Sequence, residues 1–148
     1  MRALIQRVAE ARVEVDGQLT GSIGRGLLIF LGIAKSDTEK DIDYLIDKIV
    51  EIRIFPDDSG KMNRNIRQAA GSLLIVSQFT LYADCRRGRR PSFDAAAGIQ
   101  AAEALYAAFL NSARATSVPV QCGIFQASMN VHLINDGPVT IMIDSEGK

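Results

Sequence analysis

The sequence contains few of the residues on which metal and redox chemistry depend. Among 148 residues there are two cysteines, Cys85 and Cys122, and a single histidine, His132. The cysteines do not form a C-x-x-C pair, and the usual spacing of zinc ligands is missing. We therefore expect no metal site, no cofactor and no redox role for the cysteines.

The single histidine also limits nucleophilic catalysis. A Ser-His-Asp triad requires His132 to reach a serine, but His132 lies within a strand-like run, and a surface or interface histidine is the favoured interpretation. No G-x-S-x-G motif surrounds Ser77. The spaced glycines of residues 21–26 are not followed by the Lys-Ser or Lys-Thr pair of a phosphate-binding loop, so they indicate turns.

Net charge gives no sign of a nucleic acid partner, and hydropathy gives no sign of a membrane span. Seventeen basic and 17 acidic residues cancel, so only a local cluster could indicate a nucleic acid partner. No run approaches the ~20 apolar residues of a membrane span, and residues 1–9 do not resemble a secretory signal. With 47% hydrophobic residues, we expect one soluble, cytoplasmic domain over residues 1–148, without membrane association.

The first half of the chain alternates strand and helix patterns. Asp16-Gly17 indicates a hairpin turn, and the apolar runs 27–33 and 71–76 are typical of strands buried on both faces. Ser36 and Glu39 have the spacing of a capping box, which predicts the start of a first helix. The apolar stripe of this helix is expected to consist of Ile42, Leu45, Ile46 and Ile49.

The second half adds one helix and more strands. The alanine-rich residues 94–115 predict a helix capped by Ser92 or Asp94. Further strands are expected at residues 120–125, 129–134 and 139–144. No regular βαβ units are visible, so the pattern favours an α+β fold over a doubly wound sheet. We expect mostly antiparallel sheets forming a sandwich or barrel-like core covered by two main helices.

Two polar segments interrupt the apolar strands. Residues 77–80 place two hydroxyls and an amide at a strand end, where an unpaired buried polar group costs roughly 1–3 kcal/mol. Either the fold satisfies these groups internally or a ligand does. In Gly137-Pro138, proline has no amide hydrogen, and the exposed carbonyls suit an ammonium ligand. The alternative there is a simple turn between two strands.

A cluster of arginines follows the first polar segment. A solvated loop and a holder for a phosphate-bearing ligand are both open interpretations of this cluster. Phe93, just beyond it, is either a platform for a nucleotide base or an anchor in the core. The cluster consists of Arg86, Arg87, Arg89 and Arg90.

The two polar segments, taken together and in this order, resemble the signatures of a known family. The chain resembles, nearly end to end, the D-aminoacyl-tRNA deacylases, which hydrolyse the ester between a D-amino acid and the terminal ribose of tRNA. Residues 1–8, 60–63 and 88–93 reinforce the match. The signatures are Ser77-Gln78-Phe79-Thr80-Leu81 and Asn135-Asp136-Gly137-Pro138-Val139-Thr140.

The resemblance implies a homodimer with a shared site. The Gly137-Pro138 pair, joined by a cis peptide, would enter the pocket around residues 77–80 of the other subunit. Its carbonyls would hold the substrate ammonium, and its bulk would exclude L side chains while D-amino acids and glycine pass. Thr80 and the amides near Phe79 and Thr80 would stabilise the oxyanion, with the substrate ribose hydroxyl assisting in place of a side-chain base.

The site residues implied by the resemblance fall into two groups, and no metal is among them. Arg7 would brace the Gly-Pro segment. The chain departs from the family pattern at Gln126 and Ser128, where glycine and aspartate are usual, which affects the pocket wall and the substrate range. A non-catalytic RNA-binding module and a generic esterase remain as alternatives. The implied catalytic residues are Ser77, Gln78, Phe79 and Thr80, and the implied substrate-binding residues are Met129, Gly137, Pro138 and Arg7.

Overall fold

The computed structural model describes residues 1–146, so the last two residues of the domain expected over 1–148 lie outside the described residues. The elements in chain order are β1 (Arg2–Val15), β2 (Gln18–Ile23), β3 (Gly26–Gly32), α1 (Glu39–Glu51), β4 (Phe55–Pro56), β5 (Met62–Arg64), β6 (Ser72–Ser77), the 3-10 helix η1 (Phe79–Tyr82), α2 (Ile99–Arg114), β7 (Val120–Cys122) and β8 (Asn130–Asp144).

Strand β1 organises the main sheet. Its residues 2–8 pair with β3, its residues 11–15 pair with β2, and β8 runs antiparallel along nearly its whole length. Beyond β3 the sheet continues with β6 and β7, both in parallel pairing. A Cβ built on Gly21 of β2 would lie 2.8 Å from the carbonyl oxygen of Cys122 in β7. Because glycine has no side chain, β2 can approach β7 at the opposite edge of the sheet, which gives the barrel-like shape.

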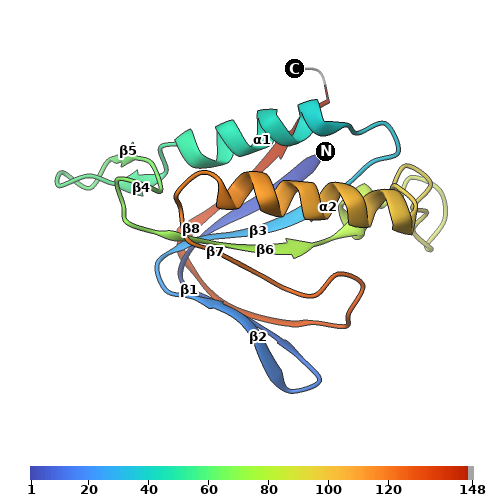
Figure 1. Cartoon of the computed structure of the whole chain (residues 1–148), viewed down its shortest axis with the longest axis horizontal. Coiled ribbons are helices and arrows are strands. Elements are labelled where there is room, and N and C mark those ends of the chain that lie inside the picture. Colours follow the sequence, from blue (N-terminus) through green and yellow to red (C-terminus); the bar gives the residue numbers. More distant parts are fainter. Residues whose placement is uncertain (147–148) are drawn as a thin grey trace.

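Both long helices cover the same face of this sheet (Figure 1). Helix α1 connects β3 to β6, and α2 connects β6 to β7, so each helix joins neighbouring parallel strands. Because both connections step in the same direction across the sheet, right-handed crossovers place both helices on one side. The α+β class with a barrel-like sheet and two helices is confirmed, but the expected absence of βαβ units was wrong.

The main core lies between the helices and the sheet. The predicted stripe of α1 is buried against β3, β6 and α2, and its four members are each at most 8% exposed. A second apolar cluster fills the other face of the sheet and includes Val8, Val13, Leu28 and Leu74. Within residues 1–146, no helix combines the length and the apolar character that crossing a membrane requires.

Both helices begin later than the sequence pattern indicates. The N-cap of α1 is Thr38, whose amide donates to Asp41 Oδ2 at 2.8 Å, so the capping pair lies two residues beyond Ser36 and Glu39. The N-cap of α2 is Gly98, and neither Ser92 nor Asp94 caps the helix. Residues 94–98 instead run beside the end of β3, where the Ala97 amide donates to the Ile33 carbonyl at 2.9 Å.

The last strand is continuous where two strands and a turn were expected. β8 extends through residues 135–138, and pairing with β1 is interrupted there without ending. In the register, Gln6 faces Thr140 and Val8 faces Asn135, so a single β1 residue lies opposite residues 136–139. This segment is therefore a bulge in an otherwise regular ladder. We call residues 135–140 the Gly-Pro bulge.

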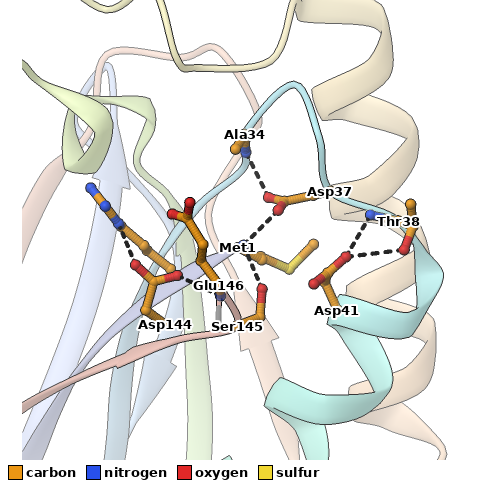
Figure 2. A network of polar contacts seen from close by, with 9 residues as sticks. Met1, Ala34, Asp37, Thr38, Asp41, Asp144, Ser145 and Glu146 are labelled. Atoms are coloured by element: carbon orange, nitrogen blue, oxygen red, sulfur yellow. Dashed lines mark hydrogen bonds and ion pairs between the residues drawn. The ribbon is translucent and has the colours of Figure 1, made fainter. Parts of the chain in front are cut away.

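The start of β1 is tied to the end of β8 by a buried polar network (Figure 2). The α-ammonium of Met1 donates to Asp37 Oδ1 and to Ser145 Oγ, each at 2.6 Å. The other carboxylate oxygen of Asp37 accepts from the Ala34 amide at 2.6 Å. The Asp37 carboxylate thus joins the β3–α1 loop to the start of β1, and the Met1 ammonium links it to Ser145 at the end of β8.

Candidate functional site

A cavity of about 590 Å³ opens at the carboxyl end of β6. Its walls come from the ends of β3 and β6, from the first turns of α2, and from the segment between β7 and β8. None of the described residues that line it has a titratable side chain. The lining residues are Leu31, Ile33, Val76, Ser77, Gln78, Phe79, Ala97, Ile99, Ala102, Phe125, Gln126, Ala127, Met129 and Val131.

The first signature forms the polar edge of this cavity. Ser77 is the last residue of β6, and the Gln78 amide donates to the Leu31 carbonyl at 2.8 Å, which continues the pairing with β3. The chain then turns into η1. The side-chain amide of Gln78 donates to Thr80 Oγ1. Because Thr80 Oγ1 accepts this bond, the hydroxyl proton of Thr80 is left to donate to another acceptor.

The short helix η1 leaves two backbone donors free of intrahelical bonds. The amides of Phe79 and Thr80 are its first N–H groups, and no carbonyl of the helix can accept from them. The Phe79 side chain is 59% exposed although it is large and apolar. The first signature therefore presents a ring, a hydroxyl and two amides at the surface next to the cavity.

The opposite wall is held in place from α2. The Tyr106 hydroxyl donates to the Ile75 carbonyl at 2.9 Å, and its ring lies 5.7 Å from the ring of Phe125. Burial raises the pKa of Tyr106, which keeps this hydroxyl protonated. A Cβ built on Gly123 would lie 2.5 Å from the sulfur of Met129. Glycine at this position therefore makes room for the Met129 side chain in the wall.

Gln126 adopts an unusual backbone conformation in the same wall. Its φ is +64°, in the left-handed region that glycine adopts most easily. The side chain of this residue borders the cavity. The position at which the family pattern has glycine is therefore also a position at which the backbone favours glycine.

The second signature lies apart from the cavity of its own chain. Gly137 and Pro138 are exposed, are joined by a cis peptide bond, and are not among the lining residues in the described part of the chain. Gly137 has a φ of +128°, and a Cβ there would lie 2.8 Å from Val139 Cγ2. The position therefore requires glycine for two reasons, its φ and its close neighbour.

Arg7 holds the Gly-Pro bulge from beneath. It is 8% exposed, its Nε donates to the Asp136 carbonyl at 3.2 Å and lies 3.1 Å from Asp136 Oδ2, and its Nη1 donates to the Ile54 carbonyl. The Asn135 side chain donates to the carbonyls of Arg7 and Val139, each at 3.0 Å. The bulge is thus fixed by side chains on both strands.

The structure divides the implied site residues into two groups. Ser77, Gln78, Phe79 and Met129 line the cavity, and Thr80 is bonded to Gln78 at its edge. The other group, Arg7 with Gly137 and Pro138, forms the bulge.

The lone histidine belongs to neither group. His132 Nε2 lies 3.5 Å from Glu14 Oε2 on β1, and His132 does not line the cavity. No hydrogen bond joins His132 to a serine within residues 1–146, and its charged neighbour is Glu14.

Sequence reasoning missed the contribution of α2 to the cavity. Ile99 and Ala102 line it, and Ile99 is 60% exposed despite its size. The alanine-rich pattern of residues 94–115 predicts a helix but no cavity wall. The three-residue spacing between them gave a signal, because it places both on one side of the first turn.

Comparisons with known proteins agree along the whole chain. The sequence model of the family described as D-Tyr-tRNA(Tyr) deacylase matches residues 4–144. A D-aminoacyl-tRNA deacylase of Solibacter usitatus (strain Ellin6076) is 58% identical over 146 residues, covering 99% of this chain and 97% of the relative. The one from Geobacter sulfurreducens (strain ATCC 51573 / DSM 12127 / PCA) is 54% identical over 148 residues, with 100% and 97% covered.

Two solved structures have the same fold. One, titled c-Myc DNA Unwinding Element Binding Protein, superposes with a TM-score of 0.93 at 40% identity and covers 98% of this chain and 99% of its own. The other is described as a probable eukaryotic D-amino acid tRNA deacylase, with a TM-score of 0.81 over 96% and 97% of the two chains. At 17% identity, this second structure supports the fold alone.

Proposed function

This chain belongs to the D-Tyr-tRNA(Tyr) deacylase family and is a D-aminoacyl-tRNA deacylase, and from this premise we propose that its ester-cleaving site is completed by a second copy of the chain. The observation that carries the proposal is the separation of the two signatures. The first borders a cavity, whereas the second is a rigid, exposed bulge that does not line that cavity.

The cavity at residues 77–80 receives the aminoacyl group. Its walls are apolar apart from Ser77, Gln78 and Gln126, which suits an amino-acid side chain. Since none of the described lining residues has a side chain that can act as a base, hydrolysis depends on hydrogen-bond donors directed at the developing oxyanion. These donors are the Thr80 hydroxyl and the amides of Phe79 and Thr80, and the ribose hydroxyl of the substrate assists the attack on the ester.

The Gly-Pro bulge of the partner subunit closes this cavity and selects the substrate. Its carbonyl oxygens accept hydrogen bonds from the substrate ammonium, while Pro138 occupies the space that an L side chain would need. Arg7 and Asn135 support this role because they fix the bulge in place. Only the L enantiomer is excluded. The D enantiomer and glycine, which lacks a side chain, are accepted.

Exposed apolar residues on β8 support association of two copies into a homodimer. Ile134 and Met142 flank the Gly-Pro bulge and are 56% and 48% exposed. Beyond β1, β8 pairs with no other strand of residues 1–146. An open strand edge with apolar side chains favours contact with another chain. We take the functional unit to be a homodimer of the 1–148 domain in the cytoplasm, where it meets charged tRNA.

The function is tested by measuring release of amino acid from charged tRNA. D-tyrosyl-tRNA, L-tyrosyl-tRNA and glycyl-tRNA are each incubated with the purified protein, and free amino acid is followed over time. We expect release from the D-tyrosyl and glycyl substrates and none above background from the L-tyrosyl substrate. Equal rates for the two tyrosyl enantiomers would contradict selection by exclusion, and no release from any substrate would contradict the activity.

A further inference from the structure

The loop of residues 85–91, the arginine loop, concentrates positive charge in a chain whose net charge is zero. Arg86 is neutralised by Asp84, whose carboxylate accepts from Arg86 Nη2 at 2.6 Å and from Nε at 2.9 Å. Hydrogen bonds from Arg86 lower the pKa of Asp84 to about 2, so this pair stays ionised at neutral pH. One of the four arginines is therefore matched by a carboxylate.

The other three arginines have no such partner. Arg87, Arg89 and Arg90 are exposed and make no hydrogen bond or ion pair with any residue in 1–146. Three unmatched guanidinium groups within four residues repel one another and are strongly attracted to an anion with several charges. An RNA backbone carries such charges at regular intervals.

The arginine loop is closed at its base. Asp84 and Ser92 pair as an isolated antiparallel bridge, with the Asp84 amide donating to the Ser92 carbonyl at 2.8 Å and the reverse bond at 3.0 Å. Gly88, with a φ of +71°, supplies the turn between the two pairs of arginines. The guanidinium groups therefore extend from a short, tied loop.

The arginine loop is also attached to the edge of the cavity. Phe93 follows the bridge, and its ring contacts the ring of Phe79 edge-on, with 5.0 Å between centroids. Phe79 lines the cavity. Arg90 and Phe93 are three positions apart in the sequence, so their Cα atoms lie within roughly 11 Å of one another. An anion bound by the loop is consequently close to a ligand in the cavity.

We propose that Arg87, Arg89 and Arg90 bind backbone phosphates near the 3′ end of the tRNA whose aminoacyl group occupies the cavity. The inference rests on the proposed function, which places the ester at Phe79 and Thr80. The RNA chain leaving the ester must pass the rim of the cavity, and Phe79, Phe93 and the arginine loop form one side of that rim. These contacts supply affinity for RNA without reading its sequence.

The test separates contacts to the RNA chain from contacts to the ester. The triple variant R87Q/R89Q/R90Q is compared with wild type on D-tyrosyl-tRNA and on D-tyrosyl-adenosine, which retains the ester but has no phosphate. We expect KM for the tRNA substrate to rise about 10- to 100-fold and its dependence on log salt to fall by about two to three units. The rate on D-tyrosyl-adenosine should stay within about twofold of wild type, because no phosphate contact is lost.

A matched control removes the same charge at the other end of the molecule. Arg53 and Arg67 flank the β4–β5 hairpin and Lys61 lies in its turn, and this hairpin lies opposite the arginine loop in Figure 1. The variant R53Q/K61Q/R67Q should leave KM for tRNA within about twofold of wild type, because loss of net charge alone is screened by salt. An equal loss in both triple variants would overturn the assignment to the arginine loop.

Other results of these assays would contradict the phosphate contacts or the deacylase activity. Unchanged KM for tRNA in R87Q/R89Q/R90Q, or an equal loss on D-tyrosyl-adenosine, contradicts the proposal while leaving the deacylase activity of wild type intact. Loss of binding to vesicles containing phosphatidylserine without loss of binding to uncharged tRNA would assign the loop to a membrane surface instead. Inactivity of the wild type on both substrates would overturn the proposed function itself.

Discussion

The two signature segments of this chain differ in how their polar groups are satisfied. At residues 77–80, the first two amides of η1 have no acceptor within the helix, Thr80 Oγ1 accepts from the Gln78 side chain, and an apolar cavity lies beside them. In the Gly-Pro bulge, Arg7 and Asn135 use their side chains to fix carbonyl groups, and the bulge does not line the cavity at residues 77–80. Residues 77–80 therefore offer free hydrogen-bond donors beside a cavity, whereas the Gly-Pro bulge is a rigid, exposed segment.

Under the proposed function, neither segment suffices alone. Free donors near a cavity stabilise charge only if the reacting group is held within hydrogen-bond reach. A rigid insert selects by shape only if it meets a cavity. If the two parts come from different subunits, selection and hydrolysis are both lost in a monomer. A substitution in either part alone should then lower the activity of the dimer.

The largest expected effect follows substitution at Gly137. In Gly137→Ala, the new Cβ meets Val139 and the φ of +128° becomes strained, so the bulge must shift. A displacement of about 1 Å at a positioning group lowers the rate about 100-fold. We expect kcat/KM for D-tyrosyl-tRNA to fall by at least this factor. The measurement is the release assay at several substrate concentrations.

Two other glycines serve as controls for this substitution. Gly24→Ala meets no atom within 4 Å and should preserve full activity. Gly17→Ala also has open space but a φ of +76°, so it should cost about 1 kcal/mol of stability without a loss of activity. Full activity in Gly137→Ala would show that the bulge tolerates displacement and does not complete the cavity.

Mixing two inactive variants gives the next largest effect. Thr80→Ala removes a hydroxyl donor at the edge of the cavity and leaves the bulge intact, whereas Gly137→Ala shifts the bulge and leaves the Thr80 hydroxyl in place. If the site is shared, a mixed dimer contains one complete site, and equal mixing after unfolding and refolding should restore about a quarter of the wild-type rate. The rate is measured across mixing ratios and should be highest at one to one. Failure to exceed the sum of the separate variants would place both parts in the same subunit.

A smaller effect is expected from loosening the support of the Gly-Pro bulge. Arg7→Lys retains the charge but cannot reach both Ile54 and Asp136, so a buried carbonyl loses its donor. The free energy of unfolding in urea should fall by about 2 kcal/mol, and KM should rise because the bulge is less rigid. Arg12→Lys is the matched control, since Arg12 is exposed and pairs with Glu14 at the surface. Its stability should change by less than about 0.5 kcal/mol.

Local sequence patterns predicted the elements that are determined by residues close together in the chain. The stripe of α1, the buried strand β6 and the hairpin turn at Asp16-Gly17, where both residues have positive φ, agree with the structure. Each depends on neighbouring residues and on one apolar face. The position of residues 77–80 at a strand end was predictable for the same reason, because the apolar run stops at Ser77.

Features set by distant partners could not be predicted in this way. Gly137-Pro138 has the composition of a turn, but pairing of β8 with β1 on both sides keeps the chain in the sheet and turns the local irregularity into a bulge. The start of α2 is delayed because residues 94–98 bond to residues 33–35, which are far away in the sequence. The parallel order of β3, β6 and β7 likewise depends on connections that no local pattern records.

The smallest expected effect distinguishes backbone strain from the shape of the cavity. Gln126 has a φ of +64°, so Gln126→Gly should relieve about 1 kcal/mol of backbone strain, partly offset by the greater freedom of glycine in the unfolded chain. We expect a net gain of about 0.5 kcal/mol in urea unfolding. Because the Gln126 side chain borders the cavity, its removal should also favour large D side chains over small ones in kcat/KM.

Ser117 provides the matched control, because its φ is +65° and it is exposed in the connection between α2 and β7. Ser117→Gly should give the same gain in stability with no change in substrate preference, since Ser117 does not border the cavity. If both variants shift stability equally and only Gln126→Gly alters the ratio of D-tyrosine to D-alanine release, the wall at Gln126 limits substrate size. If neither alters that ratio, Gln126 affects only the backbone, and the selection of substrates rests with the Gly-Pro bulge and the remaining walls of the cavity.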